Sequence, residues 1–163
     1  MRKSLLSLLV LFVYSLVAFA QEGTEITWEG QSDWTGVVEK AQQISLTQGD
    51  WSIQASKETG STNPTVNPNS FDFRAYAKNV VMVGNSTENI GKLVFHISAA
   101  GKKRWTDVNP SQGVITEDFD NSMIIWEANG EAVQSVSFTV GETATLGTET
   151  GKAGQFDFTS VTA

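Results

Sequence analysis

The sequence predicts an all-β protein, a single antiparallel β-sandwich that is jelly-roll-like and has about eight strands. Short segments along the chain alternate apolar and polar residues with a period of two, which is typical of strands that bury one face. Turn-forming residues separate these segments at the spacing found in sandwiches. Only residues 36–43 (GVVEKAQQ) have helical character, and their short length and adjacent valines disfavour a stable helix.

The first two predicted strands form a hairpin over residues 44–55. Apolar residues alternate on both sides of Gln48-Gly49-Asp50, and a short glycine-containing turn between two alternating segments is typical of a hairpin. Trp51 lies directly after the turn, in the alternating pattern of the second strand. This pattern predicts that Trp51 packs in the core.

Six further strands complete the predicted sandwich, at residues 71–77, 80–83, 90–98, 123–126, 132–140 and 154–162. The first is expected to turn Phe71 and Phe73 inward, and the last to contain a bulge near Thr159. The continuous apolar runs at 80–83 and 123–126 are typical of strands covered on both faces. All three prolines follow asparagine, which predicts long surface loops at residues 56–70 and 106–114.

The N-terminus has the pattern of an export signal. Arg2 and Lys3 precede an apolar run that ends at Ala18-Phe19-Ala20, a small-x-small cleavage pattern. We therefore expect residues 1–20 to be a cleaved signal peptide and residues 21–163 to form the β-sandwich domain. The protein is expected to be periplasmic or extracellular, with no membrane insertion after cleavage. The alternative is that the apolar run is retained as an N-terminal anchor.

Net charge and cysteine content exclude several kinds of partner and covalent link. Removing Arg2 and Lys3 with the signal would lower the formal net charge from −7 to −9. A chain this acidic repels phosphate backbones, so we expect no nucleic-acid partner. The sequence has no cysteine, so it forms no disulfides and has no thiol for lipid attachment at the signal junction.

Several blocks of the sequence, in order, carry a resemblance to a known group of domains. The blocks are SKETGSTNP, FDFRAYAKN, IGKLVFHIS, IIWEANGEAVQSVSFTVG and KAGQFDFTSV. Together they span about residues 25–162, and they resemble small secreted β-sandwich domains of unknown function from Gram-negative gut anaerobes, which are usually appended to larger surface proteins. The matching features include Ser56-Lys57, Arg74-Ala75-Tyr76 and Trp126. The resemblance implies a sandwich fold and no particular activity.

The residues needed for catalysis are scarce. The only histidine, His96, lies in the middle of a predicted strand, and the sequence has neither a cysteine nucleophile nor a G-x-S-x-G turn. We therefore expect no enzyme activity, no cofactor and no metal. The densest acidic run contains Glu117, Asp118 and Asp120. A solvated loop, a structural calcium site and a glycosidase carboxylate pair all remain open for that run.

Two of the five tryptophans are the leading candidates for a ligand site. Trp105 follows the basic run 102–104, and Trp34 lies in a polar, glycine-flanked segment. An exposed aromatic face can stack on a sugar ring, so both residues are candidate sugar platforms. For Trp105, packing at the edge of the core is the alternative. Trp126 lies within a predicted strand and is expected in the core.

Arg74 and Asn63 complete the set of candidate ligand-binding residues. Arg74 is expected either to pair with a carboxylate or to clamp a ligand, and Asn63 lies in a loop rich in Asn, Ser and Thr. The sequence thus predicts a non-catalytic, secreted binding module with a glycan ligand, held by exposed aromatics and polar loops. The alternative is a structural or protein-interaction component of the cell envelope that binds another envelope protein.

Overall fold

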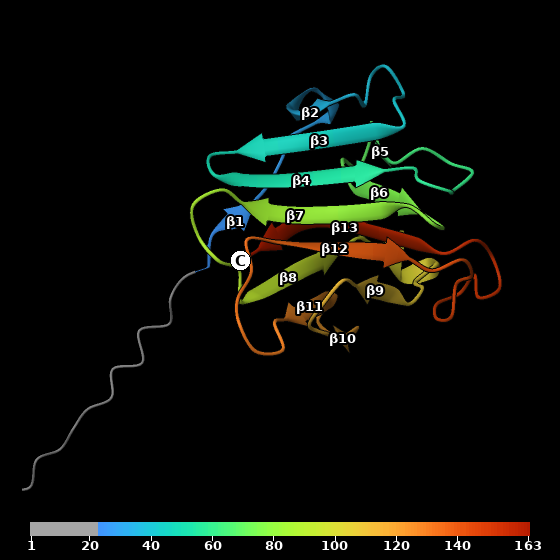
Figure 1. Cartoon of the computed structure of the whole chain (residues 1–163). Helices are drawn as coiled ribbons and strands as arrows, with labels where there is room; N and C mark the ends of the chain where they lie inside the picture. The colour runs from blue at the N-terminus through green and yellow to red at the C-terminus, as the bar shows by residue number, and fades with distance from the viewer. Residues whose placement is uncertain (1–22) are drawn as a thin grey trace, which may run out of the picture.

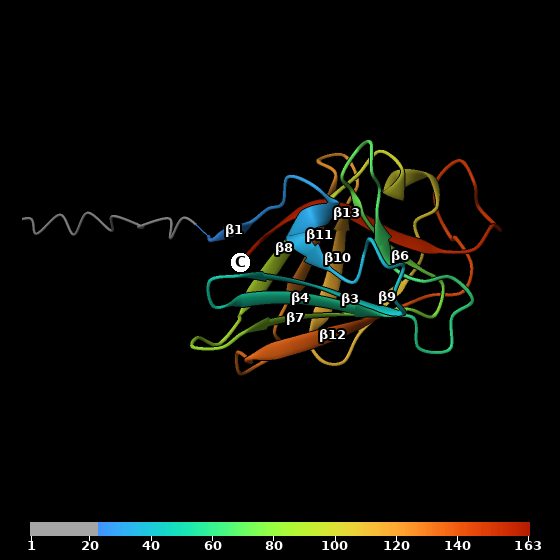
Figure 2. The ribbon, with the colours of Figure 1, turned by 90° about the horizontal axis from the view of Figure 1, so that it is seen from above.

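The computed structural model describes residues 23–163, and the predicted signal peptide at residues 1–20 lies outside this range. Two antiparallel sheets pack face to face (Figures 1 and 2), so the predicted all-β sandwich is confirmed. Among the described residues, no helix is long and apolar enough to cross a membrane.

The two sheets divide the strands almost equally. The six-stranded sheet has the order β2 (Trp34–Thr35), β3 (Gln43–Gln48), β4 (Trp51–Ser56), β7 (Val80–Asn85), β12 (Ser135–Val140) and β9 (Val108–Pro110). The seven-stranded sheet has the order β10 (Val114–Asp118), β11 (Met123–Glu127), β8 (Lys92–Ile97), β13 (Gln155–Thr162), β6 (Phe73–Tyr76) and β5 (Thr65–Val66), with β1 (Glu25–Ile26) paired to β13. Two short 3-10 helices, η1 (Gln31–Asp33) and η2 (Gly101–Lys103), lie in the connections.

The chain crosses repeatedly between the sheets. It leaves β6 for β7 in the other sheet, returns to β8, and crosses again from β12 to β13. As a result, β4 pairs with β7, and β13 lies between β8 and β6. This pattern of crossings is of the jelly-roll type. The β3–β4 hairpin turns at Gly49, whose φ of 58° is the left-handed conformation that glycine adopts without strain.

Phenylalanine side chains from both sheets fill the centre of the core. Phe95 of β8 is fully buried, and its ring centroid lies 5.2 Å from that of Phe138, 4.9 Å from Phe156 and 5.1 Å from Phe158. Phe138 belongs to the six-stranded sheet and the other three rings to the seven-stranded sheet. The Phe95–Phe138 contact therefore joins the two layers directly.

All eight predicted strands are present, but residues 23–163 contain thirteen strands. The five additional strands have two to five residues each and are β1, β2, β5, β9 and β10. β5 and β9 lie inside the two segments that were predicted as long loops. Segments this short carry too little alternation to reveal a strand from sequence. The predicted bulge is confirmed by the register shift between Phe158 and Ser160, and residues 36–40 form turns rather than a helix.

Two packing predictions were wrong. Phe71 lies before the start of β6, is 42% exposed and has a φ of 56°, so it does not point into the core. β7 and β11 are not covered on both faces, because Met82 and Ile125 on their outer sides are only partly buried. In each strand only one face packs against the opposite sheet.

The central aromatic contacts predict the effect of a core substitution. Phe95→Ala should lower the free energy of unfolding by about 3–5 kcal/mol, because it leaves a cavity between the sheets. Urea denaturation followed by circular dichroism measures this loss. Val38→Ala is the control, since Val38 is 69% exposed and its truncation should change stability by about 0.5 kcal/mol or less. Similar losses for the two variants would contradict the proposed core.

Candidate functional site

The prediction that Trp105 is an exposed sugar platform is wrong. Trp105 is fully buried, and its ring centroid lies 5.7 Å from that of Phe119 and 5.8 Å from that of Phe156. Its indole N–H donates to Oε1 of Glu117 at 2.6 Å. Trp105 therefore packs at the edge of the core, as the alternative interpretation held.

The prediction that Trp34 is an exposed platform is also wrong. Trp34 is 3% exposed, and its ring stacks on Phe73 at a centroid distance of 5.1 Å. The ring of Trp28 packs against it in a T-shaped arrangement, with the two ring centroids 5.2 Å apart. No face of the Trp34 ring remains for a ligand.

Arg74 and Asn63 make contacts that hold the fold together. Nε of Arg74 donates to Oδ2 of the buried Asp72 at 2.8 Å, so the expected carboxylate partner is present. Nδ2 of Asn63 donates to the carbonyl of Lys40 at 2.7 Å, which ties one loop to another. With both tryptophans buried, these residues form no common binding surface.

The acidic run also separates in space. Glu117 points along the core side of β10 towards Trp105, whereas Asp118 accepts hydrogen bonds from the backbone N–H and the side-chain amide of Asn121, at 3.1 and 2.8 Å. Neighbouring residues of a strand point to opposite faces, so these carboxylates do not converge. Within residues 23–163, no group of three or more His, Cys, Asp or Glu side chains is placed to hold a metal ion.

Trp51 differs from the other four tryptophans. Trp28, Trp34, Trp105 and Trp126 are all buried, whereas Trp51 is only partly buried. The indole N–H groups of Trp28, Trp105 and Trp126 donate to protein oxygens, whereas those of Trp34 and Trp51 make no hydrogen bond within the described chain. The N–H of Trp34 is buried, so Trp51 alone combines an unpaired indole N–H with a partly exposed side chain. Trp51 was predicted to be a core residue, and its side chain does pack against the core. It nevertheless keeps an open face and a free donor.

The position of Trp51 in the fold explains this exposure. Trp51 is the first residue of β4 and lies on the same side of the strand as the buried Ile53 and Ala55. It is the last inward-facing residue at one end of the sandwich. The β3–β4 turn, the β7–β8 loop, β1 and the end of β13 meet at this end (Figures 1 and 2). At the end of a sandwich, an inward-facing side chain has a neighbour on one side only.

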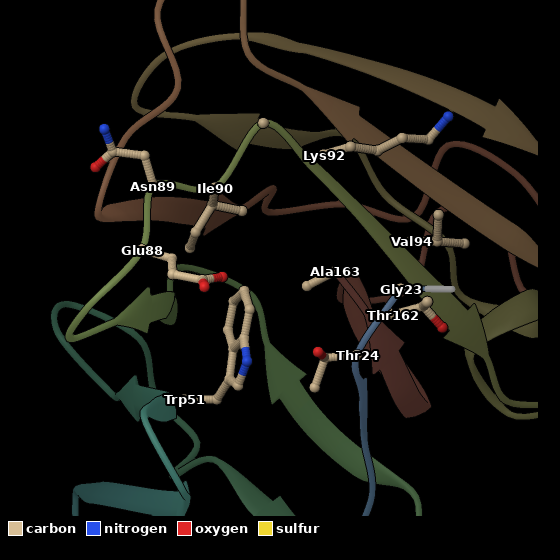
Figure 3. Close-up of a pocket in the computed structure, with 11 residues that line it drawn as sticks. Gly23, Thr24, Trp51, Glu88, Asn89, Ile90, Lys92, Val94, Thr162 and Ala163 are labelled. Carbon is tan, nitrogen blue, oxygen red and sulfur yellow. The ribbon is translucent and has the colours of Figure 1, made fainter. Parts of the chain in front are cut away.

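A groove of about 570 Å³ opens beside Trp51 (Figure 3), a volume typical of small-molecule sites. Both sheets and the β7–β8 loop contribute to it. The lining residues combine apolar surface with hydroxyl, amide and charged groups and are Gly23, Thr24, Trp51, Glu88, Asn89, Ile90, Gly91, Lys92, Val94, Thr162 and Ala163.

Two further hollows, each of about 350 Å³, share Trp51 with this groove. One lies between Gln48–Trp51 and Asn85–Glu88, and the other runs over the outer side of β4 and β7 towards Gln134. Because Trp51 lines all three hollows, they form one irregular surface around this residue. We call this surface, defined by the residues lining the three hollows, the Trp51 cleft.

The loop beside Trp51 is held in place by its own hydrogen bonds. Oδ1 of the buried Asn85 accepts from the backbone N–H groups of Thr87 and Glu88, at 2.9 and 2.8 Å. The backbones of Ile90 and Val133 exchange two hydrogen bonds, at 2.6 and 3.0 Å. An asparagine that caps a turn in this way fixes the direction of the following residues. Glu88 is therefore positioned by a well-determined turn.

Some charged groups around the cleft are already paired with other protein groups, and one is not. Lys92 pairs with Glu127 at 3.0 Å, and Asp50 accepts hydroxyl hydrogen bonds from Ser86 and Thr87, at 3.0 and 3.2 Å. None of the ion pairs or side-chain hydrogen bonds among residues 23–163 involves the carboxylate of Glu88. In Figure 3 this carboxylate lies beside the ring of Trp51, while the ammonium of Lys92 points away from it.

Comparison with known proteins gives no further lead. No protein-family model matches the chain, no curated protein is significantly similar to it, and no solved structure is. Functional inference therefore rests on the geometry of the cleft.

A second unusual group is the carboxylate of Asp157. It is fully buried on the side of β13 opposite Phe156 and Phe158, and neither of its oxygens has a hydrogen-bond partner. Gly101 of η2 covers it, and a Cβ at that glycine would lie 2.5 Å from the carbonyl oxygen of Asp157. η2 thus seals the carboxylate away from solvent, so Asp157 belongs to the packing of the fold and not to an open site.

Burial raises the pKa of Asp157 to about 8, and the attraction of Arg74 offsets only part of this effect. The neighbouring Asp72 behaves differently. Burial alone would raise its pKa, but hydrogen bonds from Arg74 and Ser70 outweigh burial and hold that pKa below its usual value. Near neutral pH, Asp72 is therefore ionised and Asp157 is protonated, although Arg74 attracts both carboxylates.

These shifts predict how stability depends on pH. Between about pH 4 and 8, Asp157 is protonated in the folded state but ionised in the unfolded state, so stability falls as pH rises. The slope from this group is at most about 1.4 kcal/mol per pH unit. Asp157→Asn removes the titration, so relative to wild type it should stabilise the protein increasingly from pH 5 to about pH 8, above which the difference levels off.

Thermal unfolding of both proteins at pH 5, 7 and 9 measures this difference. Asp120→Asn is the control, because it removes the same charge from an exposed side chain of the β10–β11 turn. Its melting temperature should follow that of wild type at every pH. If Asp157→Asn also followed wild type from pH 5 to pH 9, Asp157 would not be the buried, protonated group described above.

Proposed function

We propose that this protein is an exported, non-catalytic module that binds a glycan chain in the Trp51 cleft. One observation carries the proposal. A half-buried tryptophan with an open ring face and a free indole N–H stands between three adjoining hollows, among hydroxyl, amide and carboxylate groups. Export is proposed from the signal-like pattern of residues 1–20.

The chemistry of the cleft suits a sugar. The ring of Trp51 can stack on the C–H face of a pyranose, and its indole N–H can donate to a hydroxyl. Thr24 and Asn89 supply polar groups around the groove for further hydrogen bonds, whereas Oγ1 of Thr162 is already hydrogen-bonded to Nε2 of His96 at 3.1 Å. A polymer would place successive sugar rings in the adjoining hollows, so the shape favours a chain over a single sugar. Such contacts give modest affinity at each sugar unit.

A binding role fits the carboxylates of the cleft better than hydrolysis. Glycoside hydrolysis needs two carboxyl groups, one to protonate the leaving oxygen and one to act as nucleophile or base. Both oxygens of Asp50 accept hydroxyl hydrogen bonds, and only the carboxylate of Glu88 remains free beside Trp51. One free carboxylate can hold a ligand but does not complete this mechanism.

The second candidate function is a structural or protein-interaction role in the cell envelope. The observation that favours it is the edge strand β10, which pairs with β11 on one side only in the described sheet and carries Val114, 51% exposed. An extended segment of an envelope protein could add to this edge by backbone hydrogen bonds. Binding of this kind would not depend on Trp51.

A polysaccharide pull-down tests the proposed function. Protein purified from the full-length coding sequence should be retained on at least one insoluble or immobilised glycan of a broad panel. Trp51→Ala should weaken retention by about tenfold or more, because it removes the aromatic contact area. Trp51→Phe keeps a ring and should retain part of the affinity.

Phe71→Ala is the matched control, since Phe71 is an exposed aromatic outside the cleft. Its retention should equal that of wild type, and circular dichroism should show that all variants are folded. Retention on no glycan, or retention that is unchanged in folded Trp51→Ala, would contradict the proposal and favour the β10 alternative.

A further inference from the structure

From the charges around Trp51 we infer that the cleft selects a glycan with free, protonated amino groups, that is, a polymer of amino sugars. This inference rests on the proposed function, and it assigns the chemical class of the ligand. It is carried by the juxtaposition of a free carboxylate and an open tryptophan ring in one groove.

Glu88 is the central residue of this inference. Its carboxylate lies beside the Trp51 ring (Figure 3) and has no ion-pair partner among residues 23–163. The turn capped by Asn85 holds its backbone in place. A carboxylate next to an aromatic ring recognises an ammonium group in two ways, by a charge-assisted hydrogen bond and by cation–π attraction.

The remaining charges of the cleft point to the same ligand. The only basic residue that lines the groove is Lys92, whose ammonium is already paired with Glu127 and directed away from Trp51. Asp50 adds a second negative charge in the adjoining hollow. A uronate or sulfated chain would meet these two carboxylates without a free cation to balance it. The whole chain also carries more acidic than basic residues, 18 against 11, so its net negative charge likewise repels an anionic ligand and attracts a cationic one.

A neutral sugar chain would leave the charge of Glu88 uncompensated. Stacking a sugar on Trp51 removes water from the neighbouring carboxylate, and this loss of hydration costs free energy unless a cation or several donors replace the water. An amino sugar supplies that cation and still offers hydroxyl groups to Thr24 and Asn89. The amine thus engages the one charged group that the protein leaves free in the groove.

Isothermal titration calorimetry with two matched ligands tests this inference. The ligands are a fully deacetylated glucosamine hexasaccharide and its fully N-acetylated counterpart, at about pH 5.5, where the sugar amine is charged. Wild type should bind the amine form about tenfold or more tightly. Raising the salt concentration from about 50 mM to about 500 mM should reduce this preference, because it screens the charges.

Glu88→Gln keeps the shape of the side chain and removes its charge. It should lower the affinity for the amine form to that for the acetylated form, while binding of the acetylated form stays within about twofold of wild type. Glu39→Gln is the control, since Glu39 is exposed in the turn before β3, at the opposite end of that strand from the cleft. It should leave both affinities unchanged.

The outcomes separate the inference from the proposed function. Equal or tighter binding of the acetylated form, or a preference that survives Glu88→Gln, would overturn the amine assignment and leave a neutral-glycan module. A lysine-containing peptide that displaced the amine form at lower concentration would overturn the choice of a sugar ligand. Binding of neither hexasaccharide would overturn the amine assignment as well, and the polysaccharide panel would then decide separately on the proposed function.

Discussion

Aromatic packing between the two sheets is the interaction on which the rest of the structure depends. The chain has no cysteine, so no covalent cross-link holds the layers together. Phe95 contacts Phe138 across the sandwich and Phe156 and Phe158 within its own sheet. Such edge-to-face pairs add about 0.5–1.5 kcal/mol each to the free energy gained by burial. They also set the spacing of the sheets, and with it the width of the opening at each end.

The same packing decides which tryptophans are available to a ligand. Trp34 and Trp105 extend the aromatic core sideways and are enclosed by Phe73, Phe119 and Phe156. Trp51 stands at the end of the sandwich, where the packing stops and the β7–β8 loop and the residues just before β1 line a groove. The core holds its ring in place on one side, and the other side faces the groove. The ring is therefore held rigidly and is still accessible to a ligand. Rigid aromatic surfaces lose little entropy when a ligand binds.

The sequence predicted the fold more successfully than the site, for physical reasons. Alternation in the long strands reports burial against the opposite sheet, and the predicted inward residues such as Phe95 and Phe138 are buried. Trp105 is enclosed by Phe119 and Phe156, and its indole N–H is bonded to Glu117 of β10. All three partners are distant in sequence, so no local signal revealed its burial. Trp51 alternates with Ile53 like a core residue. Its place directly after the hairpin turn, at the very end of a strand, was the available indication that one face stays open.

A ligand in the Trp51 cleft meets Trp51 and none of the other four tryptophans, and nuclear magnetic resonance of the indole N–H groups can detect this difference. The five tryptophans give up to five indole signals, and Trp51→Phe identifies that of Trp51. During titration with the glycan that the protein retains, the Trp51 signal should move progressively, while those of the four buried tryptophans stay in place. A Trp51 signal that does not move, with or without changes in the others, would show that the ligand does not bind at Trp51.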